Sequence, residues 1–158
     1  MKKTLLALFA AFALLSSCKK SVDGGCDYDA CATVAAQNEI SAVQSYLTQN
    51  SISGALQHCS GAFYKILDPG TGNSANACSK VNVTYRGTFT SGYEFDRGTI
   101  DIGLDGVIKG WRNLVPLVKS GGHIMLYIPP SLGYGMFDQP GVPGNSILIF
   151  DVTLNSVQ

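Results

Sequence analysis

Charged side chains and histidines are scarce in this sequence. Of its 158 residues, 14% are Asp, Glu, Lys or Arg, the formal net charge is zero, and the histidines number two. No block of basic residues follows Lys19-Lys20, so a nucleic acid is excluded as the expected partner. The sequence also contains neither a GxSxG nucleophile elbow nor a phosphate-binding P-loop, which excludes the hydrolases and nucleotide-binding enzymes that depend on them.

The longest apolar run, LLALFAAFALL at residues 5–15, is too short to cross a bilayer. A membrane-spanning helix needs roughly 20 apolar residues. Lys2-Lys3 precede this run and small residues follow it, which is the pattern of a secretory signal peptide. We therefore expect the chain to be exported.

The sequence LSSC at residues 15–18 is similar to the lipobox of bacterial lipoproteins, in which an aliphatic and two small residues precede a cysteine. This similarity implies that residues 1–17 are a lipoprotein signal peptide and that Cys18 carries the lipid. An ordinary signal peptide cleaved near Ser17 is the alternative. Lys19 is not the Asp that retains lipoproteins in the inner membrane. We therefore expect a lipid-anchored protein of a Gram-negative-type cell envelope, at the outer membrane, on its periplasmic or surface side.

Four cysteines follow the lipidation site: Cys26, Cys31, Cys59 and Cys78. An even number in an exported chain indicates two disulfides, with three possible pairings. Proximity in sequence favours Cys26–Cys31 with Cys59–Cys78. A zinc site is the weaker alternative because the spacings form no paired CxxC knuckles and only two histidines are present. Free buried thiols are the third possibility, and we expect neither a metal nor a cofactor.

The pattern after Cys18 divides the mature chain. Residues 18–29 are small, polar and glycine-containing, as expected of a tether between lipid and domain. Residues 30–60 are expected to hold an amphipathic helix over 30–49 and a connector. The helix is predicted from the spacing of apolar side chains at Val34, Ile40, Val43, Tyr46 and Leu47. Such a helix packs on the domain or, alternatively, against a second copy of the chain.

Strand-like sequence fills the remainder, from residue 61 to residue 158. Strands are expected at residues 62–67, 80–87, 93–96, 99–104, 123–129 and 146–154. Among them, apolar residues at helical spacing extend from Trp111 to Val118, and Pro116 limits that helix to a short one. The pattern indicates an α+β fold, in which a twisted antiparallel sheet carries one short helix on its concave face.

Four stretches in this region together resemble an FKBP-type peptidyl-prolyl cis-trans isomerase. They are VNVTYRGTFTSGYEFD at 81–96, GVIKGW at 106–111, IPPSLGYG at 128–135 and LIFDVTL at 148–154. The resemblance covers residues 61–157 and implies a bent antiparallel sheet wrapped around the short helix at 110–118. The preceding helix is similar to that of bacterial, exported members.

The resemblance also implies the residues of a hydrophobic substrate pocket. Its implied catalytic residues are Tyr85, Phe95, Asp96 and Tyr134. Its implied substrate-binding residues are Ile100, Val107, Ile108, Trp111, Val142 and Phe150. Trp111 is expected at the floor, the aromatic residues at the walls, and the pair Val107-Ile108 at the rim. Ile100 occupies a position where the family often has an aromatic residue, so that wall is less complete here.

The implied activity is rotation of the bond between a residue and the proline that follows it, without covalent chemistry. Resonance in that bond produces a barrier of about 18–20 kcal/mol. An apolar pocket stabilises the charge-separated planar form less than water does, which favours the twisted state. Expected partners are proline-containing unfolded or partly folded polypeptides, the membrane through the lipid anchor, and macrolide inhibitors of the family. The alternative is a proline-peptide binding module or chaperone with weak or no turnover.

Overall fold

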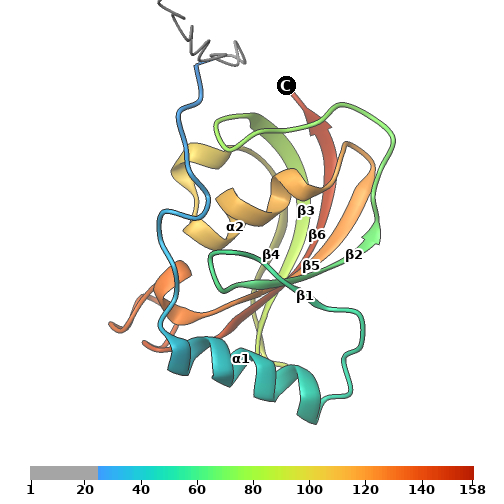
Figure 1. The fold of residues 1–158 in the computed structure, drawn as a ribbon. Coiled ribbons are helices and arrows are strands. Elements are labelled where there is room, and N and C mark those ends of the chain that lie inside the picture. Colours follow the sequence, from blue (N-terminus) through green and yellow to red (C-terminus); the bar gives the residue numbers. More distant parts are fainter. Residues whose placement is uncertain (1–24) are drawn as a thin grey trace, which may run out of the picture.

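The computed structural model describes residues 25–158 (Figure 1). The predicted signal peptide at 1–17, the predicted lipidation site Cys18 and the predicted tether as far as residue 24 lie outside the described residues. Within residues 25–158, no helix combines the length and the apolar character that crossing a bilayer requires.

A six-stranded antiparallel sheet, with strand order β1-β2-β5-β6-β3-β4, forms the body of the described chain. Its strands are β1 Leu56–Gln57, β2 Phe63–Asp68, β3 Lys80–Phe89, β4 Glu94–Gly103, β5 Gly122–Ile128 and β6 Leu148–Val157. The helices are α1 Gln37–Gln49 and α2 Lys109–Leu114, with single 3-10 turns η1 Leu104–Gly106, η2 Val115–Leu117 and η3 Pro130–Leu132. Figure 1 shows the sheet bent around α2, with α1 at one end of the sheet. The predicted α+β architecture is confirmed.

The two strands predicted at 93–96 and 99–104 form the single strand β4. Both segments pair with β3 in a register that runs from Thr88↔Glu94 to Lys80↔Gly103, with one irregularity between Gly87 and Thr88. Gly98, between the two segments, pairs with Tyr85 and does not interrupt the ladder. The two segments therefore make one continuous edge strand.

Helix α2 lies close against the sheet because of Gly110. A Cβ atom at this position would lie 2.6 Å from two side-chain carbons of Ile128 on β5. Leu114 and Val115, at the end of α2 and the start of η2, are completely buried. Pro116 lies inside η2, so the predicted short helix ends in a 3-10 turn. This packing leaves Trp111 between α2 and the sheet.

Helix α1 begins at Gln37, seven residues later than predicted from the pattern at 30–49. Ala36 is extended, and Val34, included in the predicted helical pattern, is 58% exposed. The buried residues Ile40, Val43 and Leu47 do follow the helical spacing. The segment before Gln37 is held in another conformation by two disulfides.

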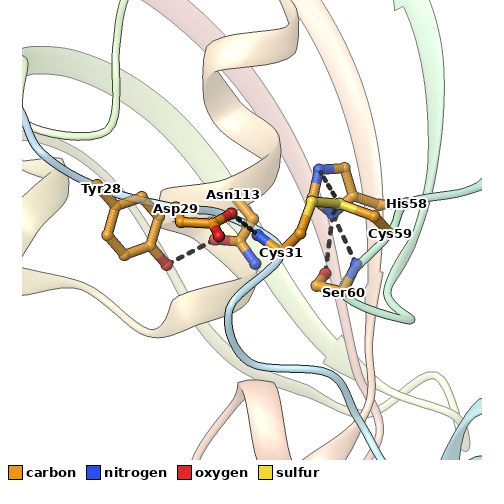
Figure 2. Close-up of a disulfide and its surroundings, with 7 residues drawn as sticks. All are labelled: Tyr28, Asp29, Cys31, His58, Cys59, Ser60 and Asn113. Carbon is orange, nitrogen blue, oxygen red and sulfur yellow. Dashed lines mark hydrogen bonds between the residues drawn. A yellow bond between two sulfur atoms is a disulfide. The ribbon is translucent and has the colours of Figure 1, made fainter.

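Those disulfides are Cys26–Cys78 and Cys31–Cys59, with Cα–Cα distances of 5.7 and 5.5 Å. The pairing Cys26–Cys31 with Cys59–Cys78, predicted from proximity in sequence, is therefore wrong. The N-terminal segment passes two different loops in turn, and each of its cysteines bonds to the loop it meets. Figure 2 shows the Cys31–Cys59 bond beside His58. Residues 26–29, expected to belong to the tether, are thus fastened to the domain.

Candidate functional site

A cavity of about 250 Å³ opens between α2, the strands β3, β4 and β6, and the segment that follows η3. Its lining residues are Tyr85, Asp96, Ile100, Ile102, Gly106, Val107, Ile108, Trp111, Tyr134 and Phe150. Most of these side chains are aliphatic or aromatic, and their polar groups are two tyrosine hydroxyls, one carboxylate and the indole N–H of Trp111. Small-molecule and peptide sites have this composition, an apolar body with a few placed polar atoms.

Trp111 on α2 forms the apolar floor of the cavity. Trp111 is 5% exposed, and its indole meets the rings of Tyr85 and Phe150 edge to face, with centroids 5.2 Å apart in both cases. Edge-to-face contacts of this kind fix the orientation of an aromatic ring. Within residues 25–158, the Trp111 Nε1 is the one buried side-chain nitrogen or oxygen without a hydrogen-bond partner. Among the described residues, the floor is therefore an indole that aromatic packing orients and whose N–H forms no hydrogen bond with the protein.

Gly87 on β3 makes room for the wall residue Phe150 and for Phe95, which packs against it. A Cβ atom at this position would lie 2.7 Å from the Phe95 ring and 2.9 Å from the Phe150 ring. Those two rings pack edge to face at 5.5 Å. A larger residue at position 87 would displace one or both of these rings.

A hydrogen bond between neighbouring strands sets the polar side of the cavity. The Tyr85 hydroxyl on β3 donates to Asp96 Oδ2 on β4 over 2.8 Å. Burial, followed by this hydrogen bond and the Asp96 charge, raises the pKa of Tyr85 to about 12. The Tyr85 hydroxyl therefore remains a neutral donor at physiological pH and holds the carboxylate at the cavity.

Tyr134, another polar lining residue, lies just after η3 and is 44% exposed. Burial of part of the side chain, followed by the Asp96 charge, raises its pKa. The start of η3 is attached to α1, because the backbone N–H and the hydroxyl of Ser131 donate to Glu39 Oε2 over 3.0 and 2.6 Å. Tyr134 thus presents a neutral hydroxyl from a turn that α1 anchors.

The rim comes from the connector between η1 and α2, where Val107 and Ile108 lie. The Ile108 carbonyl accepts from the N–H groups of Trp111 and Arg112, which begins the helix. Among the described residues, the Ile108 N–H has no backbone partner. It is a donor available to a bound peptide at the rim.

Comparisons with known proteins identify the domain that holds this cavity. The family model described as FKBP-type peptidyl-prolyl cis-trans isomerase matches residues 72–155, more than half of the chain. The chain belongs to the FKBP-type peptidyl-prolyl cis-trans isomerase family. The matched residues contain all ten residues that line the cavity.

Curated relatives and a solved structure that are similar to the chain are named peptidyl-prolyl cis-trans isomerases. The chain is 41% identical over 110 residues to the FKBP-type peptidyl-prolyl cis-trans isomerase FkpA of Escherichia coli (strain K12). This alignment covers 66% of this chain and 41% of that protein. It is 38% identical over 122 residues to the peptidyl-prolyl cis-trans isomerase Mip of Coxiella burnetii, covering 73% and 53%. The chain therefore spans about two fifths to half of the length of these curated relatives.

The crystal structure of FkpA from Escherichia coli superposes with a TM-score of 0.70 at 35% identity, covering 77% of this chain and 60% of that one. A peptidyl-prolyl cis-trans isomerase structure from Pseudomonas syringae gives 0.68 at 26% identity, covering 80% and 98%. Both likenesses support the FKBP-type fold described above.

In this FKBP-type domain the fold brings together eight of the ten site residues expected from the sequence. Phe95 and Val142 lie outside the cavity lining. Phe95 packs behind the wall, with its ring 4.7 Å from that of Phe89. Val142 is 7% exposed and lies in a tight turn with Gln139, each backbone N–H donating to the other's carbonyl over 2.9 Å.

Sequence reasoning missed two lining residues, Ile102 and Gly106. Ile102 follows Ile100 with the alternation of a strand, so periodicity placed it on the same face of β4. Gly106, in η1, presents backbone alone. Only the path of the chain around the cavity reveals it.

Proposed function

We propose that this chain is a peptidyl-prolyl cis-trans isomerase that accelerates rotation of the bond preceding proline. The observation that carries the proposal is the cavity itself: an indole floor, aromatic walls and a fixed Tyr85–Asp96 pair in an FKBP-type domain. The names of the relatives support it further.

In this proposal, the proline ring lies on Trp111 and the peptide bond before it leaves water. The barrier to rotation, about 18–20 kcal/mol in water, arises from resonance. Removing water destabilises the charge-separated planar form relative to the twisted form, so the barrier falls without any covalent step. The Tyr134 hydroxyl and the Ile108 N–H are the donors that hold the flanking carbonyls.

Asp96 has an electrostatic role in the same scheme. Its carboxylate accepts from Tyr85 and lies at the cavity, beside the proposed place of the proline ring. A fixed negative charge there interacts with the dipole of the bond as it rotates, and no reorganisation of the site is needed during the reaction. Phe95 and Val142 support this site from outside, the first behind Phe150 and the second within the loop.

We propose proline-containing, unfolded or partly folded envelope proteins as substrates. The signal-peptide and lipobox patterns support a lipid anchor at Cys18 and a location at the outer membrane. The family resemblance supports macrolide compounds as inhibitors that compete for the same cavity.

A second candidate function is a binding module that holds proline-bearing segments with slow turnover. Ile100, aliphatic where the family often has an aromatic residue, favours it, as does the position of Phe95 outside the lining. Both features reduce the number of aromatic rings that line the cavity walls.

The test is catalysed isomerisation of a short proline peptide by the full chain, purified with its disulfides formed. We expect acceleration that a macrolide inhibitor abolishes. Tyr134→Phe removes one donor and lowers kcat/KM by about two- to tenfold, the range of a typical hydrogen bond. Tyr64→Phe, which removes a hydroxyl on β2 outside the cavity lining, is the matched control.

No acceleration by a folded protein at micromolar concentration contradicts the enzyme proposal. Saturable binding of the same peptide without turnover supports the binding module instead.

A further inference from the structure

Helix α2, which carries the floor residue Trp111, is too short to be stable alone. It has six residues, its N-cap Ile108 provides no side-chain hydrogen bond, and Gly110 lies within it. Isolated helices shorter than about 12 residues are marginal in water, so tertiary contacts must hold a helix of this length. The inner face of α2 packs on the sheet through Gly110 and Leu114.

Further contacts of α2 come from a segment that precedes the family-matched residues 72–155. This N-terminal strap, residues 26–36, runs alongside α2 and then enters α1 (Figure 1). The bonds Cys26–Cys78 and Cys31–Cys59 attach it at two points, and the Ala35 N–H donates to the Ser60 carbonyl over 2.9 Å. Tyr28 lies between the two disulfides, so its position is fixed from both directions.

Tyr28 contacts the two residues that follow Trp111 in α2. Its hydroxyl donates to Asn113 Oδ1 over 2.7 Å, as Figure 2 shows, and Asn113 is 5% exposed. The Arg112 guanidinium carbon lies 3.8 Å from the centre of the Tyr28 ring. Arg112 in turn donates through Nε to the Ala77 carbonyl over 2.9 Å, next to the half-cystine Cys78. The strap, the disulfide and α2 therefore form one connected unit.

A second contact joins the strap to the start of α2. Lys109 Nζ donates to Thr33 Oγ1 over 3.2 Å. Three of the six residues of α2 thus contact the strap or the loop bonded to it, and they lie on both sides of Trp111 in sequence. The contacts act on the orientation of the helix, and hence on the orientation of its indole.

We propose that Tyr28 is a positioning residue for the isomerase site, through which the strap holds α2 and fixes Trp111 as the cavity floor. Tyr28 contacts α2 and is absent from the cavity lining, so its effect on a bound proline passes through the helix. Loss of the contact lets the indole depart from its edge-to-face packing with Tyr85 and Phe150. The kinetic consequence rests on the proposed isomerase function, whereas the effect on Trp111 does not.

Trp111 is the sole tryptophan of the chain, so tryptophan fluorescence reports on the floor alone. Two variants separate the two contacts of Tyr28. Tyr28→Phe removes the hydroxyl bond to Asn113 and keeps the ring beneath Arg112, whereas Tyr28→Ala removes both. Tyr64→Phe again serves as the control for loss of a tyrosine hydroxyl.

The experiment uses the full chain, with its disulfides formed and in a mild non-ionic detergent, at a temperature where every variant is folded. Acrylamide quenching of Trp111 fluorescence, KM and kcat are measured for each variant. For Tyr28→Ala we expect the quenching constant and KM each to rise by about two- to tenfold, the range of the lost hydrogen bond and cation–π contact. Tyr28→Phe is expected to give a smaller rise, and Tyr64→Phe none.

A lower unfolding temperature for Tyr28→Ala, with quenching and KM equal to those of the parent, overturns the proposal, because Tyr28 then only stabilises the fold. If Tyr28→Ala does not fold, Tyr28→Phe decides in the same way. If the parent chain has no isomerase activity, the proposed function fails, and the quenching measurement still decides whether the strap fixes Trp111.

Discussion

The two sides of the cavity are built in different ways. On the floor side, Trp111 and Asn113 are each 5% exposed, and α2 is enclosed between the sheet and a strap with two disulfides. On the loop side, the segment after η3 leaves Tyr134, Met136 and Phe137 exposed by 44%, 67% and 75%. Hydrogen bonds within that loop join its own residues, such as the bond from the Asn145 N–H to the Gly135 carbonyl at 2.9 Å.

This difference indicates a division of roles. Regions with few buried apolar contacts open at a lower free energy than regions enclosed in the core. We therefore expect the floor to define the shape that selects a proline ring, and the loop side to admit and release the chain around it. The predictions below test that contrast, from the largest expected effect to the smallest.

The largest contrast is expected between Trp111→Ala and Phe137→Ala. Removing the buried indole leaves a cavity and is expected to lower the free energy of unfolding by about 3–5 kcal/mol and to abolish peptide binding. Removing the exposed phenyl ring is expected to change stability by less than about 0.5 kcal/mol. Denaturant unfolding followed by far-ultraviolet circular dichroism measures both. Similar losses for the two variants would show that the floor is no more integral to the fold than the loop.

The second prediction concerns the disulfide Cys26–Cys78, whose Cys78 sulfur accepts a hydrogen bond from Arg112 of α2. The double variant Cys26→Ser, Cys78→Ser opens a bond with a sequence separation of 52 residues and is expected to cost about 2–4 kcal/mol of unfolding free energy. Hydrogen exchange should increase in α2 and stay unchanged in the turn that joins Gln139 to Val142. Equal increases in both places would contradict an independent loop side.

The smallest effect is expected at the hydrogen-bonded pair of Tyr85 and Asp96 in the cavity lining. The pKa of Tyr85 is raised from 10.0 to about 12, so the neutral hydroxyl is favoured in the folded state. The stability from this shift is complete below pH 10 and is lost as the pH rises through about 12. Asp96→Asn should lower the pKa of Tyr85, and burial should still hold it above 10.0.

Alkaline titration of tyrosinate absorbance, with Tyr85→Phe subtracted, measures this change. The loop variant Asp138→Asn is the control and should leave the titration of Tyr85 in place. An unchanged curve for Asp96→Asn would mean that the hydrogen bond of 2.8 Å does not hold in solution.

Local pattern was enough to predict much of the fold. Val81 and Val83 alternate with polar neighbours and are completely buried on β3, and Ile40, Val43 and Leu47 form the buried face of α1. In both cases the spacing of apolar side chains matches the geometry of one element. The start of α1 was missed because disulfides, rather than helical propensity, decide the conformation of the residues before Gln37.

The residues of the site also divide into those whose positions the sequence predicted and those whose positions it did not. Ordered motifs were sufficient to bring Tyr85, Asp96, Trp111 and Tyr134 into one expected pocket, since each motif places its residue at a known point of the fold. Phe95 and Val142 departed from that expectation. Their positions depend on local features, the irregularity between β3 and β4 at Gly87 and the tight turn at Gln139, which the motifs do not encode.

The sequence alone therefore determined the fold class, the family resemblance and the aromatic character of the pocket, because each depends on residue type and on spacing within one element or motif. Tertiary structure alone decided the disulfide pairing, the strap along α2 and the contact of Tyr28 with Asn113, residues 85 positions apart. Such contacts arise where distant segments meet, and no local periodicity carries information about which segments those are.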